Sequence, residues 1–137
     1  MEEKKRVKLL NFGADLEQDL IQEIENQNQI EIEEVRIKAS LNLKKHSTYI
    51  QISDIIKKNQ QHFKGEFIVN LPGLPIFSAM LVTEIHALTG KFPVILECVK
   101  DYQKNNMFSS FSYKRLYNLD RERIQSRENY KGETSKL

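Results

Sequence analysis

Apolar and polar residues near the start of the chain follow first the pattern of a buried strand and then that of a helix. Residues 7–12 form an apolar run that stops at Gly13, which is typical of a strand inside a parallel sheet. Asp15 stands where a helix N-cap is expected, with Gln18 three residues later, and the polar residues 26–29 end the segment. Four apolar residues share one face of the predicted helix: Leu16, Leu20, Ile21 and Ile24.

The next segment predicts a strand at the edge of the sheet and a second amphipathic helix. Small or apolar residues alternate with charged and polar ones, as in a strand with one more exposed face. These residues are Val35, Ile37, Ala39 and Leu41. Ser47 or Thr48 can begin a helix, and Gly65 can close it. The apolar face of that helix consists of Ile52, Ile55, Ile56 and Phe63.

The second half of the chain predicts a third strand, a third helix and a hairpin. The apolar residues 67–70 are followed by the sequence LPGLP, and because proline favours the first turn of a helix, Pro75 is expected to open a helix that ends at Gly90. We expect this helix to bury Phe77, Met80, Leu81, Ile85 and Leu88. Residues 92–99 and 111–119 predict two further strands, and the polar loop at 101–106 suits an antiparallel hairpin.

The order of these elements predicts an α/β fold. Strands that alternate with helices, followed by a hairpin, give a Rossmann-like, mostly parallel sheet with helices on both faces and a C-terminal antiparallel hairpin. A chain of 137 residues is long enough for one such domain and too short for two, so we assign residues 1–120 to it. Residues 121–137 are polar and are expected to form a C-terminal helix that frays into a tail.

Composition and charge narrow the class of ligand and the compartment. The formal net charge is +2 and the basic residues are spread along the chain, which does not favour duplex nucleic acid but leaves a small anionic ligand open. Residues 1–6 are charged and only a short apolar run follows, so neither a signal peptide nor a membrane span is expected, and the protein is predicted to be cytoplasmic. The single cysteine, Cys98, is interpreted as a core residue of a strand.

Two turns of the predicted sheet form the candidate ligand-binding site. In such sheets the first and third strands are usually neighbours, and ligands bind at their carboxyl ends. Each turn combines an asparagine, which donates and accepts hydrogen bonds, with a glycine, which lets main-chain amides approach a ligand. The second turn leads into a helix N-terminus, which favours phosphate. The candidate residues are Asn11, Phe12, Gly13, Asn70, Leu71, Pro72, Gly73 and Leu74, with Ser78 as a hydroxyl donor in the first helical turn.

Other interpretations stay open beside this one. Glycine and proline after a strand are also ordinary turn residues, and the sequence carries neither the GxGxxG nor the Walker motif, so an enzyme that uses a dinucleotide or nucleoside triphosphate is disfavoured. His46, His62 and His86 lack the spacing of a metal site, and no metal or cofactor is predicted. Arg36 and Lys38 could reach a phosphate at the end of the sheet, but outward charges on an edge strand also prevent aggregation, and we favour this second interpretation.

Four segments resemble a known family. They are LLNFG at residues 9–13, VNLPGL at 69–74, EIHALTGKFPVIL at 84–96 and YNLD at 117–120, whereas residues 29–64 show little specific similarity. In these segments the chain resembles the small stand-alone CARF-like (CRISPR-associated Rossmann fold) proteins of ring-nuclease type in type III CRISPR systems.

The resemblance implies a function as well as a fold. Proteins of this kind bind cyclic oligoadenylate second messengers, usually cyclic tetra-adenylate, across the two-fold axis of a homodimer. Assembly into a higher oligomer stays open. The ligand contacts that it implies are Asn11, Phe12, Gly13, Asn70, Pro72, Gly73 and Leu74. By sequestering the ring, or by slowly cleaving it through a metal-independent attack of a ribose 2′-hydroxyl, the protein would down-regulate antiviral signalling.

Cleavage stays open at this point because the sequence places no well-positioned Lys, Arg or His beside either turn. Two alternatives outside CRISPR also stay open. One is a flavodoxin-like protein that binds a mononucleotide or another small molecule, and the other is a module for protein–protein contacts.

Overall fold

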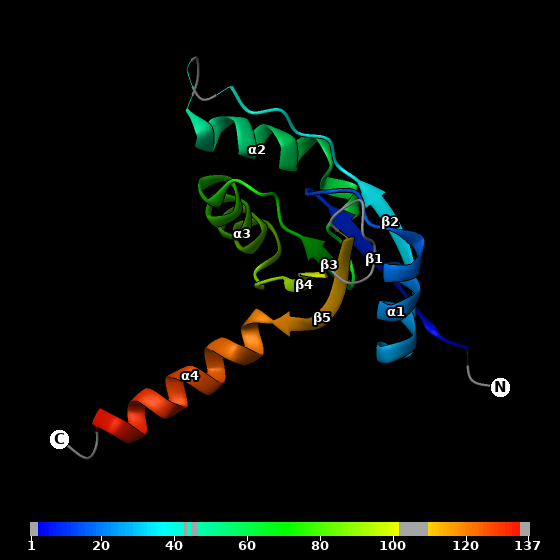
Figure 1. Ribbon diagram of the computed structural model, residues 1–137. Coiled ribbons are helices and arrows are strands. Elements are labelled where there is room, and N and C mark those ends of the chain that lie inside the picture. Colours follow the sequence, from blue (N-terminus) through cyan, green and yellow to red (C-terminus); the bar gives the residue numbers. More distant parts are fainter. Residues whose placement is uncertain (1–2, 43, 45–46, 102–109, 135–137) are drawn as a thin grey trace.

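The chain folds into one sheet with helices on both faces, which confirms the predicted Rossmann-like α/β class (Figure 1). Over residues 3–42, 44, 47–101 and 110–134, which the structure describes, the computed structural model contains a five-stranded sheet in the order β2-β1-β3-β4-β5. Its strands are β1 (Lys5–Asn11), β2 (Ile30–Arg36), β3 (Phe67–Asn70), β4 (Val94–Asp101) and β5 (Ser110–Asn118). The first four run parallel, and β5 is antiparallel to β4.

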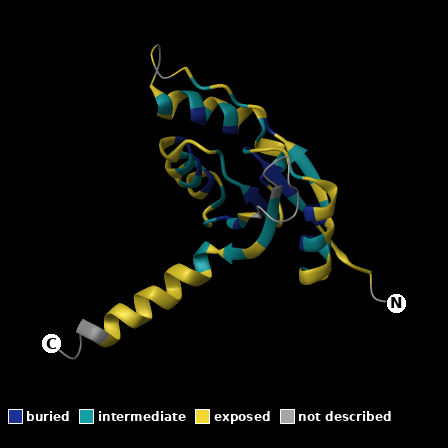
Figure 2. Ribbon diagram, in the orientation of Figure 1, coloured by how far each residue is buried: buried dark blue, intermediate teal, exposed yellow. Residues whose placement is uncertain are grey.

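Two hydrophobic cores lie on opposite faces of the sheet. Helix α1 (Gln18–Asn28) packs on one face, where Leu20 and Ile24 share a core with Leu9 of β1. Helices α2 (Thr48–Lys58) and α3 (Pro75–Thr89) cover the other face, where Ile52 of α2 shares a core with Leu10. Neighbouring residues of β1 serve opposite cores because side chains alternate along a strand. Figure 2 shows the buried residues concentrated on the strands and on the sheet-facing sides of the helices.

Helix α3 agrees closely with its prediction. It begins with Pro75 at its first position, and Gly90 ends it with a φ of 79°, in the left-handed region that glycine adopts without strain. Its buried residues are Phe77, Leu81 and Ile85, and Met80 is half-buried against the same core. The prediction is wrong for Leu88, which keeps 38% of its surface exposed.

The predicted start of the first helix is wrong. Helix α1 begins at Gln18 with Glu17 as its N-cap, and no side chain caps it. Asp15, the expected cap, forms an ion pair with Arg36 instead. The expected apolar face is otherwise present, with Leu20, Ile21 and Ile24 buried and Leu16 half-buried ahead of the helix.

The predicted bounds of the edge strand are also wrong. β2 does occupy the edge of the sheet, but it begins at Ile30 rather than Val35 and ends at Arg36. Its neighbour β1 ends at Asn11, which pairs with Arg36, so no partner strand continues beyond that point. Residues 37–41 leave the sheet yet direct alternate side chains into the core shared with α2. This packing explains why their sequence has the period of a strand.

Helix α2 starts as predicted and ends earlier. The Ser47 hydroxyl accepts a hydrogen bond from Ile50 N at 3.4 Å, which confirms Ser47 as the N-cap. The helix ends at Lys58, and a short 3-10 turn (η1, Gln60–His62) follows it. Gly65, with a φ of 72°, therefore belongs to the turn before β3 rather than to the helix end.

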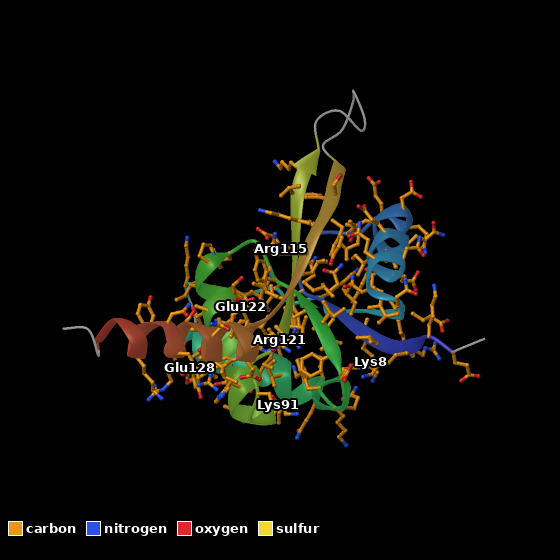
Figure 3. All side chains as sticks on the ribbon, turned by 90° about the horizontal axis from the view of Figure 1, so that it is seen from below. Lys8, Lys91, Arg115, Arg121, Glu122 and Glu128 are labelled. Carbon is orange, nitrogen blue, oxygen red and sulfur yellow. The ribbon has the colours of Figure 1, made fainter. Side chains whose placement is uncertain are left out.

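The hairpin and the last helix extend from the body of the molecule. β4 and β5 pair with a register shift at Glu97 and Cys98, and most of the predicted loop at 101–106 lies outside the described residues. Helix α4 (Leu119–Thr134) follows β5 directly as a continuous helix of sixteen residues. Figure 3 shows charges of both signs on it, including Arg121, Glu122 and Glu128. Neither α4 nor any other helix in the described part is both long and apolar enough to cross a bilayer.

Candidate ligand-binding site at the carboxyl ends of β1 and β3

The two turns predicted to bind a ligand lie side by side. β1 and β3 are neighbours in the sheet, with Asn11 paired to Asn70 at their carboxyl ends. Just beyond, Phe12 N donates a hydrogen bond to Asn70 O at 3.0 Å. Gly13 comes so close to the second turn that a Cβ atom on it would lie 2.5 Å from the carbonyl oxygen of Leu71. The turns therefore touch through their main chains, and this contact requires a glycine.

A buried asparagine joins the two turns. Asn11 is 4% exposed, and its side-chain oxygen accepts hydrogen bonds from Gly13 N and Asn70 Nδ2, both at 2.9 Å. Its Nδ2 donates to Ala14 O at 3.0 Å and to Glu34 Oε2 at 3.3 Å. These four bonds use the full hydrogen-bonding capacity of an asparagine side chain. In this arrangement Asn11 sets the shape of the site.

Phe12 anchors the first turn to the core. The residue is 8% exposed, and its ring lies 6.4 Å from the ring of Phe63 and 6.3 Å from that of Phe77, measured between centroids. Edge-to-face and tilted ring contacts at these distances are favourable. The side chain of Phe12 therefore faces the interior, and what this residue offers to a ligand is the placement of the turn.

The second turn ends at a helix N-terminus that no side chain caps. Leu74 is the N-cap of α3, and Pro75 at the first helical position has no N–H group. The N–H groups of Ile76 and Phe77, in the first helical turn, have no acceptor within the helix. Uncapped amides and the positive end of the helix dipole together attract an anion at this point.

Ser78 and Gly73 shape the exposed rim of the second turn. The Ser78 hydroxyl donates a hydrogen bond to Pro72 O at 2.9 Å, so it holds the turn against the helix. Gly73 is exposed, and a Cβ atom on it would meet nothing within 4 Å. Leu74 is 40% exposed. A ligand at the carboxyl edge would therefore reach the main chain at Gly73 without obstruction from neighbouring side chains.

A cleft with a volume of about 310 Å³ opens beside the first turn on the side of β2. Arg36 lines it, with Nη1 at 2.8 Å from Asp15 Oδ1 and Nε at 3.8 Å from Glu34 Oε1. Lys38 lines it too and takes part in none of the ion pairs among the described residues. Two basic residues thus adjoin the candidate site. This placement agrees with the possibility, raised from the sequence, that both reach a phosphate at the end of the sheet, although β2 ends at Arg36 and Lys38 lies beyond it.

The surroundings of Cys98, His62 and His86 do not point to a reactive thiol or a metal site. Burial raises the pKa of the Cys98 thiol on β4 to about 11, so the thiol is protonated at neutral pH. The His86 ring lies 4.3 Å from the ring of Phe92, and His62 belongs to η1. His46 lies outside the described residues. Within the described ranges, no three His, Cys, Asp or Glu side chains come together as a possible metal site.

In comparisons with known proteins, no family model, curated protein or solved structure matches this chain. The resemblance to CARF-like proteins thus stays an expectation from four segments of the sequence.

Proposed function

We propose that this protein binds cyclic oligoadenylate, with cyclic tetra-adenylate as the expected ring, and thereby lowers the free messenger in type III CRISPR signalling. The observation that carries the proposal is the contact between the two turns, which joins Gly13 to Leu71 beside the uncapped start of α3. Nucleotides bind at this edge of Rossmann-like sheets, and main-chain amides at a helix start suit phosphate.

The charges around the site suit a ligand whose phosphates are spread along a ring. Arg36 and Lys38 line the cleft on the side of β2, while the start of α3 lies on the side of β3. Asp15 pairs with Arg36, but the Asp15 side chain is 83% exposed and can turn away when a phosphate competes for the guanidinium. Main-chain amides with two cations can therefore hold a polyanion although the net charge is only +2.

The size of the cleft favours a site shared between two copies of the chain. Its volume of about 310 Å³ is at the lower end of the roughly 300–1,000 Å³ of small-molecule pockets, and a ring of several nucleotides is larger than the cleft. Because such a ring consists of identical units, two copies related by a two-fold axis can each hold one half of it. The proposal therefore includes a homodimer with the ring between two carboxyl edges.

Sequestration is the central claim, and cleavage is a separate outcome. Attack by a ribose 2′-hydroxyl needs in-line geometry and stabilisation of the developing charge. Incubation of labelled cyclic tetra-adenylate with protein in excess separates the two outcomes. If all of the ring is bound and it is recovered unchanged, nuclease activity is excluded.

Thermal unfolding in the presence of cyclic oligoadenylates of several ring sizes tests the proposal. A ligand that binds only the folded protein stabilises it by about 2.7 kcal/mol at a concentration of 100 Kd. Gly73→Val should keep the stability of the parent, because the space around Gly73 is open, and should lose the response to the ring. Gly132→Val on the projecting α4 is the matched control, since Gly132 has equally open surroundings. Failure of every ring to stabilise the parent, or an undiminished response in Gly73→Val, contradicts the proposal.

A mononucleotide is the second candidate ligand, because a cleft of about 310 Å³ in a single chain is large enough for one nucleotide. Flavin mononucleotide and adenosine monophosphate therefore belong in the same thermal series. Stabilisation by either of them, without a response to any ring, would favour a flavodoxin-like carrier. A colourless preparation that flavin does not stabilise would remove the flavin form of this alternative.

A further inference from the structure

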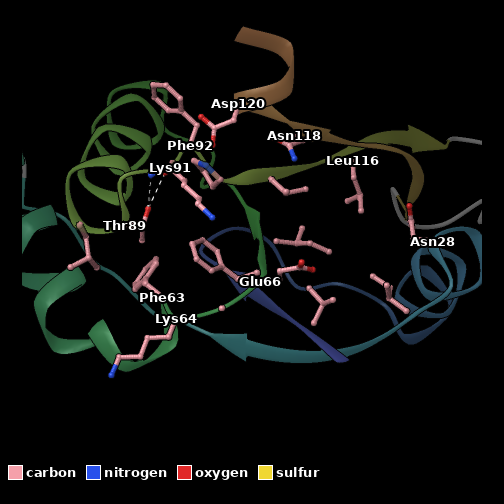
Figure 4. A pocket seen from close by; sticks show the side chains of 18 of the residues that line it. Asn28, Phe63, Lys64, Glu66, Thr89, Lys91, Phe92, Leu116, Asn118 and Asp120 are labelled. Carbon is pink, nitrogen blue, oxygen red and sulfur yellow. Dashed lines mark hydrogen bonds between the residues drawn. The ribbon is translucent and has the colours of Figure 1, made fainter. Parts of the chain in front are cut away.

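A second cavity, larger than the cleft beside the first turn, lies at the opposite end of the sheet from the two turns. Its volume is about 810 Å³, and it is lined by the amino ends of the four parallel strands and by the carboxyl end of β5 (Figure 4). Apolar side chains make up much of its wall: Val7, Ile30, Phe67, Val94 and Leu116. Leu88, which is exposed against expectation, also lines it. An apolar ligand in the cavity would therefore remove Leu88 from water.

The two carboxylates at this cavity already have partners. Glu66 forms an ion pair with Lys5. Asp120 Oδ2 accepts a hydrogen bond from Phe92 N at 3.1 Å, which ties the start of α4 to the segment between α3 and β4. Neither carboxylate is therefore the natural partner for a cationic ligand.

Two other side chains at the cavity can donate hydrogen bonds to a ligand. Lys91 takes part in none of the ion pairs among the described residues, and Figure 4 shows its side chain extending into the cavity. Asn118 uses its Oδ1 to accept a hydrogen bond from Arg121 N at 3.1 Å, which leaves its Nδ2 to donate. Lys64 also lines the cavity, but its side chain points away from it in Figure 4. Lys91 Nζ and Asn118 Nδ2 are thus two donors that a ligand in the cavity could use, and one of them is cationic.

We propose that this cavity binds an amphipathic carboxylate. The carboxylate accepts charge-assisted hydrogen bonds from Lys91 Nζ and Asn118 Nδ2, while the apolar body of the ligand lies against Phe67, Leu116 and Leu88. The cavity volume is within the roughly 300–1,000 Å³ of small-molecule sites. This second site lies at the end of the sheet where the parallel strands begin, and it does not depend on the proposed binding of cyclic oligoadenylate.

Titration calorimetry of the full chain with octanoate, and with octanol as the uncharged probe of equal length, tests this proposal. We expect saturable binding of octanoate with one site per chain and weaker binding of octanol. Lys91→Met should weaken octanoate binding by about tenfold, as the loss of one charge-assisted hydrogen bond does, and leave octanol binding unchanged. Lys64→Met is the matched control and should bind octanoate like the parent, because its side chain points away from the cavity.

Both lysines are exposed, so both variants should fold, which circular dichroism and the midpoint of thermal unfolding will verify. The proposal is overturned if the parent shows no saturable binding of octanoate, or binds octanol equally well. It is also overturned if Lys91→Met binds octanoate like the parent, or if Lys64→Met weakens binding as much as Lys91→Met.

Discussion

Replacing Gly13 by alanine should destabilise the protein by forcing the two turns apart. The new Cβ atom would lie 2.5 Å from the carbonyl oxygen of Leu71 and 3.1 Å from Asn70 Nδ2. Because the carbonyl oxygen belongs to the main chain, it cannot rotate away as the end of a flexible side chain would. The turn after β1 or the turn after β3 must move to relieve the contact.

The size of the effect follows from this movement. Introducing a methyl group into a closely packed position typically costs about 1–3 kcal/mol. Separating the turns also weakens two hydrogen bonds, Phe12 N to Asn70 O at 3.0 Å and Asn70 Nδ2 to Asn11 Oδ1 at 2.9 Å, each with a net contribution of about 1 kcal/mol. We therefore expect the free energy of unfolding to fall by about 2–4 kcal/mol.

Equilibrium unfolding in urea, followed by circular dichroism, measures this change. With a dependence of about 1–3 kcal/mol per molar urea, the midpoint should fall by about 1–2 M while the slope stays the same. Gly73→Ala is the control in the other turn, because its Cβ meets nothing within 4 Å, and it should stay within about 0.5 kcal/mol of the parent. A Gly13→Ala midpoint equal to that of the parent would refute the contact between the turns.

Four further predictions concern the buried residues Asn11 and Cys98 and the helix cap Ser47. Asn11→Ala leaves the Gly13 amide and the Asn70 side chain without their acceptor and should cost about 2–4 kcal/mol in the same urea assay, so a loss below about 1 kcal/mol would contradict its role. Native Cys98 should react slowly with iodoacetamide at pH 8 and quickly only near pH 11, because burial raises its pKa to about 11; rapid labelling at pH 8 would show that the thiol is not shielded. Between the ordinary value of 9.0 and about 11, the native thiol keeps a proton that the unfolded one loses, so stability should fall as pH rises through this window, and less steeply in Cys98→Ala. Ser47→Ala removes an exposed cap with a 3.4 Å hydrogen bond and should lower stability by only about 0.5–1 kcal/mol, whereas a loss above about 2 kcal/mol in thermal unfolding would require another role for Ser47.

The bounds of β3 and α3 could be predicted closely from the sequence, whereas Gly65 does not mark the end of α2. β3 has the expected bounds, and α3 lies between Pro75 and Gly90 as predicted. The backbone preferences of Pro75 and Gly90 are local and need no distant contact to act. The predicted bounds of β2 are wrong because the bounds of this strand depend on a distant contact. Its carboxyl end is determined by its register with β1, which ends at Asn11. Such a pairing depends on two segments far apart in the chain and leaves no mark in either alone.

The position of the candidate site could be predicted from the sequence, but the hydrogen-bonding roles of its side chains could not. Connectivity alone brings the ends of β1 and β3 to one edge of the sheet, and the turns do meet there. The sequence does not reveal that all hydrogen bonds of the Asn11 side chain are made to protein groups. One partner, Glu34, lies on β2 and is brought near Asn11 by the register between β1 and β2. The cavity at the opposite edge is likewise assembled from strands, turns and α4, none of which carries a motif.

The amide of Asn11 has a consequence for selectivity. Since hydrogen bonds within the protein already hold both turns in place, association would immobilise few protein groups, and most of the entropy lost would come from the bound molecule. A closed ring lost most of its torsional freedom when it was made, whereas the linear product of its opening regains that freedom. If the proposed ring binds here, a preformed site of this kind would favour the closed ring over the opened one because less freedom is lost, without any contact that recognises the cut ends.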